Sequence, residues 1–116
     1  MGIRSFLPLL CAPALLAQAP TKSVEDLRAF YQQNCVKCHG ADGSATADGK
    51  KLKGFDFTDA ASLGGQSDEK MVRTIRKGIF FGWIMPSFKG ELSEADAGLM
   101  VREVLRKAQK GKPIAR

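Results

Sequence analysis

Cys35-Val36-Lys37-Cys38-His39 is the stretch that decides how the rest of this chain is interpreted. Two cysteines separated by two residues, with a histidine directly after the second, form the attachment signal for a c-type haem. The two thiols add to porphyrin vinyl groups as thioethers, and the following imidazole then lies under the iron as its proximal ligand. The motif therefore predicts one covalently bound haem c, attached at Cys35 and Cys38 and ligated by His39.

Two other kinds of site use cysteines at this spacing. A structural zinc site needs four nitrogen or sulfur ligands, and Cys11 is the only further cysteine that the chain offers. A thioredoxin-like redox pair belongs in an alternation of strands and helices, and the sequence does not show that alternation. Haem attachment is favoured over both.

The first 19 residues have the pattern of a secretory signal peptide. Arg4 supplies the positive charge, a nearly continuous apolar run extends over residues 6–17, and Ala17-Gln18-Ala19 resembles the small-x-small cleavage pattern. Any position between 14 and 19 remains open as the cleavage site. The segment predicts export to the periplasm, with residues 20–116 left as a single domain.

Cys11 raises the question of a lipid anchor. Bacterial lipoprotein signals resemble Leu-x-small-Cys, with a small residue directly before the lipidated cysteine. Here that position is occupied by Leu10, which is large. We therefore expect no lipid anchor at Cys11 and treat it as part of the signal peptide.

Three segments have the apolar spacing of amphipathic helices. The first covers roughly residues 24–38 and leads into the haem motif, the second about 68–77, and the third runs from Ser93 to about 109. Residues 40–65 are rich in turn-forming residues, with room for a short helix around 59–63. Thr21 and Lys22, and the basic segment after Gly111, are interpreted as loose tails.

His39 is the only histidine in the sequence, which excludes a second histidine ligand from the same chain. Methionine, lysine, an external ligand or no ligand remain for the sixth position of the iron. Met71 and Met100 lie on apolar helical faces, where methionine ordinarily fills a core. Met85 instead lies in irregular chain directly before Pro86, which restricts the backbone of its predecessor. This difference favours Met85 as the second ligand.

Aromatic residues surround Met85 in the most apolar segment that follows the signal. We expect them to line the haem pocket together with two aromatic residues of the long loop. Trp83 either packs there or donates its indole N–H to a haem propionate. The complete predicted set is Phe55, Phe57, Phe80, Phe81, Trp83 and Phe88.

Together these features resemble the class I c-type cytochromes in their small bacterial single-haem form. The resemblance rests on residues 35–40, on Gly49-x-x-Leu52-x-Gly54, on Met85-Pro86-Ser87-Phe88 and on a closing helix after Leu92-Ser93. It implies an all-α cytochrome c-like fold, with three main helices and long loops wrapped around one covalently bound haem. It also implies His39 and Met85 as axial ligands.

The sequence departs from that family at two places. Lys50 and Lys51 stand in the loop where the family often has a proline, near the backbone carbonyl that orients the proximal histidine. Leu27 stands where the first helix usually has a glycine. Because Ala97 and Gly98 are small, we expect Leu27 to pack against them where the first and last helices cross.

The resemblance implies an electron carrier and not an enzyme, passing single electrons between partners outside the cytoplasm. Two alternatives remain open: a gas-binding or peroxidatic haem protein with an open sixth site, and an electron-entry subunit of a larger redox enzyme. The formal net charge is +6, with basic clusters at residues 50–53 and 102–116. Such clusters favour docking to an acidic face of a redox partner. We expect a monomer, no nucleic-acid binding, and membrane contact only through a partner.

Overall fold

The computed structural model describes residues 2 and 18–115 of the chain. Most of the predicted signal peptide, including Cys11, lies outside the described residues. The part that is described contains helices and no named strand, and its one isolated β-bridge joins Ile79 and Met85. This confirms the predicted all-α fold. The helices are α1 (Val24–Asn34), α2 (Val36–His39), α3 (Ala47–Lys51), α4 (Ala60–Gly64), α5 (Asp68–Lys77), η1 (Phe80–Gly82), α6 (Glu94–Met100) and η2 (Val101–Leu105).

The first helix is divided where the sequence predicts continuity. Helix α1 begins with a capping box, in which the Ser23 side chain accepts from the Asp26 N–H and the Asp26 carboxylate accepts from the Ser23 N–H. It ends at Asn34, and the φ of Cys35 is widened to −114° at a ψ of −27° while its N–H still donates to the Tyr31 carbonyl. The short helix α2 then carries the remainder of the motif.

The closing helix contains a change of winding. Helix α6 starts at a second capping box, between Ser93 and Asp96, and runs as an α-helix to Met100. The chain continues as the π-helix η2 and ends at Leu105, before the predicted end near 109. A π-helix has i→i+5 hydrogen bonds and therefore a wider turn than an α-helix, and Val104 and Leu105 in this segment are buried.

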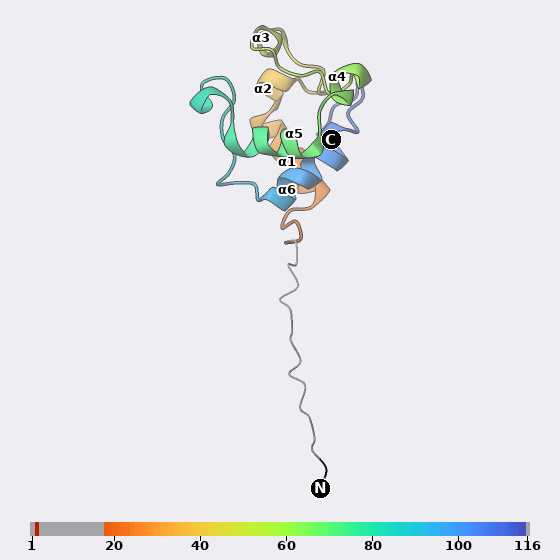
Figure 1. The fold of residues 1–116 in the computed structure, drawn as a ribbon. Coiled ribbons are helices and arrows are strands. Elements are labelled where there is room, and N and C mark those ends of the chain that lie inside the picture. Colours follow the sequence, from red (N-terminus) through yellow and green to blue (C-terminus); the bar gives the residue numbers. More distant parts are fainter. Residues whose placement is uncertain (1, 3–17, 116) are drawn as a thin grey trace.

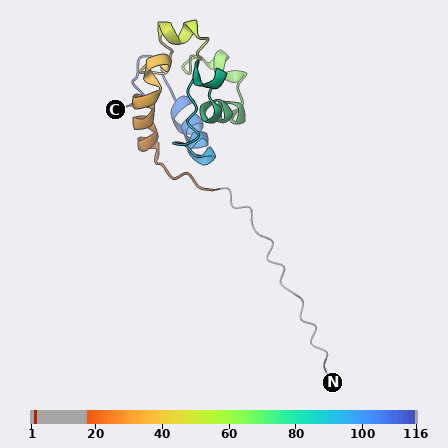
Figure 2. The same ribbon diagram turned by 90° about the vertical axis from the view of Figure 1, so that its left-hand side faces the viewer.

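Helices α1 and α5 both pack on the closing helix formed by α6 and η2, and this packing forms the core (Figure 1). Leu27 and Ala97 are both fully buried in that core, and Gly98 is buried as well. A Cβ atom built on Gly98 would first meet the Arg102 side chain, at 2.9 Å. Direct packing of Leu27 on Ala97 and Gly98 stays a prediction. Figure 2 shows α1 and the closing helix side by side from a second direction.

The two segments interpreted as tails are both attached to the fold. Buried Asp96 accepts hydrogen bonds from the N–H and the hydroxyl of Thr21, both at 2.8 Å, and from the N–H of Lys22 at 3.0 Å. At the other terminus, Ile114 is buried and its N–H donates to the carbonyl of Ala41 at 2.8 Å. The ends therefore lie against α6 and against the loop after the haem motif.

The long loop between α2 and α5 is more ordered than its composition predicts. It contains the short helix α3, which was not predicted, and α4, which lies within one residue of the expected 59–63. The hydroxyl of Tyr31 on α1 donates to the carbonyl of Gly40 at 2.6 Å and fixes the start of this loop. The described part of the chain contains no helix of the length and apolarity that crossing a bilayer requires.

Candidate haem site

No disulfide joins the two motif cysteines, and both are half-buried. Burial raises the pKa of the Cys35 thiol to about 12, and the nearby Cys38 adds to the shift. Cys35 is therefore protonated at neutral pH. Reactive redox cysteines have a lowered pKa instead, so the environment of Cys35 does not resemble that of a thioredoxin-like pair.

His39 lies at the end of α2 with its ring against Phe57. The two ring centroids are 4.9 Å apart with an interplanar angle of 28°, which is a stacked arrangement. Burial lowers the pKa of His39, and a backbone hydrogen bond at Phe55 opposes that shift. An interaction that raises a histidine pKa comes from an acceptor, so the Phe55 group is its carbonyl.

The His39 ring nonetheless keeps an unsatisfied atom. Among the described residues, Nδ1 of His39 is the one buried side-chain nitrogen or oxygen without a hydrogen bond of standard geometry. The Phe55 carbonyl is thus near the ring without fully satisfying it. A ligating histidine ordinarily donates its second ring N–H to a carbonyl or a carboxylate, and the Phe55 carbonyl is the acceptor near this ring.

Helix α3 packs directly on the backbone of the haem motif. A Cβ atom built on Gly49 would lie 1.9 Å from the carbonyl oxygen of Cys38, so only glycine fits. The Thr46 N–H donates to the same Cys38 carbonyl at 2.9 Å, and the Gly54 N–H donates to the Gly49 carbonyl at 2.7 Å. The Gly49-x-x-Leu52-x-Gly54 pattern therefore forms a close backbone support for α2.

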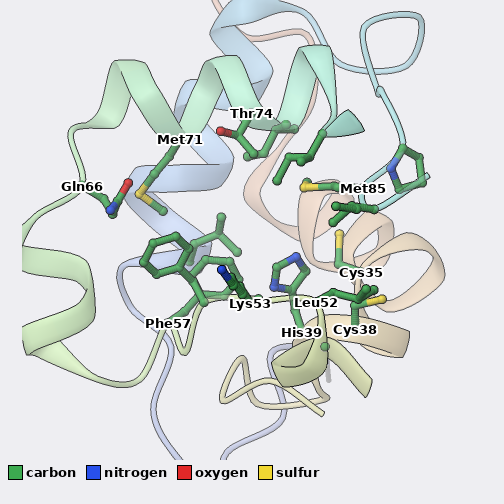
Figure 3. A pocket seen from close by; sticks show the side chains of 18 of the residues that line it. Cys35, Cys38, His39, Leu52, Lys53, Phe57, Gln66, Met71, Thr74 and Met85 are labelled. Atoms are coloured by element: carbon green, nitrogen blue, oxygen red, sulfur yellow. The ribbon is translucent and has the colours of Figure 1, made fainter. Parts of the chain in front are cut away.

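A cavity of about 270 Å³ opens between this motif and helix α5. Most of the side chains that line it are apolar. Cys35, Cys38 and His39 line one side (Figure 3). Lys53, Gln66 and Lys70 supply polar groups to the lining, and Figure 3 shows Gln66 across the cavity from the two cysteines. These three residues were not predicted as site residues, because nothing in their spacing indicates a common site.

Met85 and Met71 both line the cavity, but at different places. Figure 3 shows the Met85 thioether on the side of Cys35 and His39, whereas Met71 lies beside Gln66. Met85 is half-buried and is held by a backbone hydrogen bond from the Ile79 N–H to its carbonyl, at 2.9 Å. Met100 is buried in the helical core. Met85 thus shares the cavity with His39, whereas Met100 does not line it.

The predicted aromatic lining is found only in part. Phe55, Phe57 and Phe88 line the cavity. The other three aromatic residues do not, and they are exposed to solvent: Phe80 by 68%, Phe81 by 98% and Trp83 by 84%. The reason is a left-handed turn at residues 80–82, which directs these side chains outward. Their apolar character alone did not reveal that geometry.

Three properties of the cavity fit a covalently attached haem. The cysteines and His39 lie on one side of a largely apolar space, Met85 lies near them, and a buried ring nitrogen of His39 has no partner. Polar groups of Lys53, Gln66 and Lys70 elsewhere in the lining suit the charged propionates that the other edge of a haem carries.

Comparison with known proteins gives concordant results. A family model described as cytochrome c oxidase, cbb3-type, subunit III matches residues 22–102, which is more than half of the chain. The c-type cytochrome KustC0563 is similar, with a TM-score of 0.62 and 32% identity over 72% of this chain and 96% of its own. No curated protein matches the chain.

Two further solved structures extend the comparison. The c-type cytochrome NirC has a TM-score of 0.57 and 32% identity, over 78% of this chain and 92% of its own. The dihydro-haem d1 dehydrogenase NirN, in complex with DHE, has a TM-score of 0.53 and 23% identity over 17% of its length, and shows the shared fold alone. The chain belongs to the cbb3-type cytochrome c oxidase subunit III family and is a haem-containing electron-transfer protein of the c-type cytochromes.

Proposed function

We propose that this protein carries one electron at a time between redox partners outside the cytoplasm, through a single haem c with His39 and Met85 as axial ligands. The observation that carries the proposal is the position of Met85. Its thioether and the imidazole of His39 line the same apolar cavity, beside both attachment cysteines. A haem held there supplies a one-electron iron couple, and Met/His ligation raises its reduction potential.

The chain orients the proximal ligand through two contacts. Phe57 stacks on the His39 ring, and the Phe55 carbonyl, which lies near the ring, would accept from its second ring N–H once the iron is bound. Contacts of this second kind fix the tautomer of a ligating histidine and make it a stronger donor to the metal. Phe55 thereby takes the role that the resemblance gives to a carbonyl in this loop.

The polar residues of the cavity have a role in the same proposal. Lys53 and Lys70 are cations, and Gln66 offers an amide. They would hold the haem propionates, which are carboxylates on the porphyrin edge opposite the thioethers. Trp83 was expected as a possible hydrogen-bond donor to a propionate, but it does not line the cavity. We assign that contact to Lys53 instead.

The cellular setting is also proposed from the sequence. Residues 1–19 act as a cleaved secretory signal, and the mature protein works in the periplasm as a monomer. Its excess of basic side chains steers it to an acidic face on the redox partner. If so, the rate of electron transfer to the partner falls as salt is raised, and a rate independent of ionic strength contradicts this docking role.

A potentiometric titration of the exported holoprotein, followed by its visible spectrum, tests the proposed function. We expect one one-electron transition between two low-spin states. A high-spin ferric spectrum with turnover of peroxide would favour the open-site alternative instead. Stable co-purification with the subunits of an enzyme would favour the electron-entry subunit.

A further inference from the structure

The loop of residues 79–84, called here the aromatic loop, has an unusual backbone. Phe80, Phe81 and Gly82 follow one another with positive φ angles of 53°, 53° and 87°. Bulky L-residues rarely adopt this left-handed conformation. Strain of this kind persists only where the surrounding structure imposes it, and it gathers at functional sites. Two consecutive phenylalanines in this conformation therefore need an explanation.

Packing within the chain does not provide that explanation. Phe81 is 98% exposed and Trp83 84% exposed. Phe80 is also largely exposed, and its ring lies 6.2 Å from that of Phe81. A strained backbone that presents three large aromatic side chains to solvent gains nothing from burying them in the core. The conformation makes sense if the aromatic side chains are buried against something else.

The aromatic loop is held firmly at its base. The Ile79 N–H donates to the Met85 carbonyl at 2.9 Å, and the Trp83 N–H donates to the Phe80 carbonyl at 3.0 Å. Figure 1 shows the loop at the end of α5, projecting beyond the helices that form the core. The exposed aromatic side chains are thus presented at a convex tip, not on a flat face.

The chain on both sides of this tip is basic. Residues 70–90 contain five basic side chains and no acidic one. Lys77 directly precedes the turn into the aromatic loop and Lys89 follows its return, and both are exposed. These two lysines also line a common hollow on the surface, which carries three arginines and three carboxylates besides them: Arg73, Arg76, Arg102, Asp68, Glu69 and Glu94. The tip therefore combines aromatic side chains with flanking cations.

We propose that the aromatic loop binds the surface of an anionic lipid bilayer. Phe80, Phe81 and Trp83 enter the headgroup region, where aromatic rings are favoured, and Lys77 and Lys89 contact the lipid phosphates. A convex tip enters a fluid surface directly, whereas a protein partner would need a matching concavity. The proposal replaces the expectation that membranes are reached only through a partner with direct contact, and it does not depend on which ligands the iron has.

Membrane binding at this tip has a consequence for electron transfer. Ile79 and Ile84, at the two ends of the aromatic loop, also line the haem cavity. A bound tip therefore holds that side of the cavity near the bilayer surface. A redox partner embedded in the membrane would then be reached by diffusion in two dimensions.

Vesicle co-sedimentation of the exported holoprotein tests the proposal, with haem absorbance as the measure of bound protein. The vesicles contain phosphatidylcholine alone or with about 30% phosphatidylglycerol. We expect binding only to the anionic vesicles, and a Kd weakened about tenfold or more in each of Phe81→Ser and Trp83→Ser. Neither side chain packs in the core, so thermal unfolding should be unchanged.

Matched charge variants separate local from general electrostatics. Lys77→Glu with Lys89→Glu should weaken vesicle binding, whereas Lys110→Glu with Lys112→Glu makes the same charge change elsewhere and should weaken it much less. Binding that survives Phe81→Ser and Trp83→Ser would overturn the proposal. Failure of the parent protein to bind anionic vesicles would also overturn it. So would a Trp83→Ser variant that loses electron transfer to a soluble partner in the absence of lipid, because the aromatic loop would then bind a protein.

Discussion

The backbone N–H of Ile79 donates to the carbonyl of Met85 at 2.9 Å, and this bond closes the loop that presents the predicted second haem ligand. Gly78 makes the closure possible. Its φ is +73°, and a Cβ atom built on it would lie 2.5 Å from the Met85 carbonyl oxygen. The position of the Met85 thioether thus depends on a residue at the end of α5.

Gly78→Ala should therefore disturb the Met85 loop. With a φ of 73° and a ψ of −173°, Gly78 has a backbone conformation that is essentially restricted to glycine, and it costs another residue about 1–3 kcal/mol. The clash with Met85 adds to that cost. We expect a lower unfolding temperature and a weakened iron–sulfur charge-transfer band in the ferric protein. Gly90→Ala is the control, because nothing lies within 4 Å of the Cβ that it adds. Equal effects of both substitutions would show that Gly78 has no special role.

Gly49→Ala tests the support of the haem motif by α3. The added Cβ would lie 1.9 Å from the Cys38 carbonyl oxygen, and backbone atoms on both sides prevent an easy adjustment. Overpacking of this kind costs about 1–3 kcal/mol. We expect a lower yield of holoprotein and a lower Tm. Gly64→Ala in α4 is the control, because Gly64 faces open space, and it should leave the yield and the Tm unchanged or higher. A Gly49→Ala protein with the yield and Tm of the parent would contradict the tight contact.

The helices that the sequence predicted correctly are those with an apolar period and recognisable residues at their ends. Helix α5 has the predicted bounds of residues 68–77, because Ser67 caps its start and Gly78 ends it. Helix α3 was missed, because a five-residue helix containing glycine and two lysines has no apolar period to recognise. Its position depends on the contact between Gly49 and Cys38, which links residues distant along the chain.

The site was predictable where chemistry fixes the spacing of its residues. Cys35, Cys38 and His39 form a motif, and Met85 is distinguished by the proline after it. The outward direction of Phe81 and Trp83 was not predictable, because apolar composition indicates burial and a left-handed turn in phenylalanine residues is rare. Lys53 in turn was assigned to partner docking, since only the fold brings it to the cavity.

Lys53→Met tests the proposed propionate contact. Lys53 has a φ of 61°, and it is among the few charged residues lining the cavity. Loss of a nearby cation disfavours the less positively charged reduced iron, so the reduction potential should fall. Lys112→Met removes a distant charge and should leave the potential close to that of the parent. Equal potentials for parent and Lys53→Met would remove Lys53 from the site.

Asp96 makes the stability dependent on pH. Its burial raises the pKa, but hydrogen bonds from Lys22, Thr21 and Ser93 outweigh this effect and hold the pKa at about 2. Because the folded-state pKa is below the unfolded value, the stabilisation is present above the unfolded pKa and is lost as pH falls towards the folded one. Asp96→Asn should thus cost about 2 kcal/mol at neutral pH and much less near pH 2.

Denaturant unfolding of the holoprotein at several pH values measures this difference. Glu91→Gln, at an exposed position, is the control and should follow the parent at every pH. A constant difference between Asp96→Asn and the parent from neutral to acidic pH would show that the Asp96 charge is not the source of the stabilisation.

The central claim is that the Met85 thioether binds the haem iron, and the charge-transfer absorption between iron and sulfur in the ferric holoprotein tests it most directly. Met85→Ala should abolish this band, give a high-spin or water-ligated ferric haem and lower the reduction potential. Met71→Ala and Met100→Ala remove the same side chain from buried positions. They should keep the band and lose only stability, about 2–5 kcal/mol. A band that persists in Met85→Ala, or that is absent from the parent protein, would contradict the account.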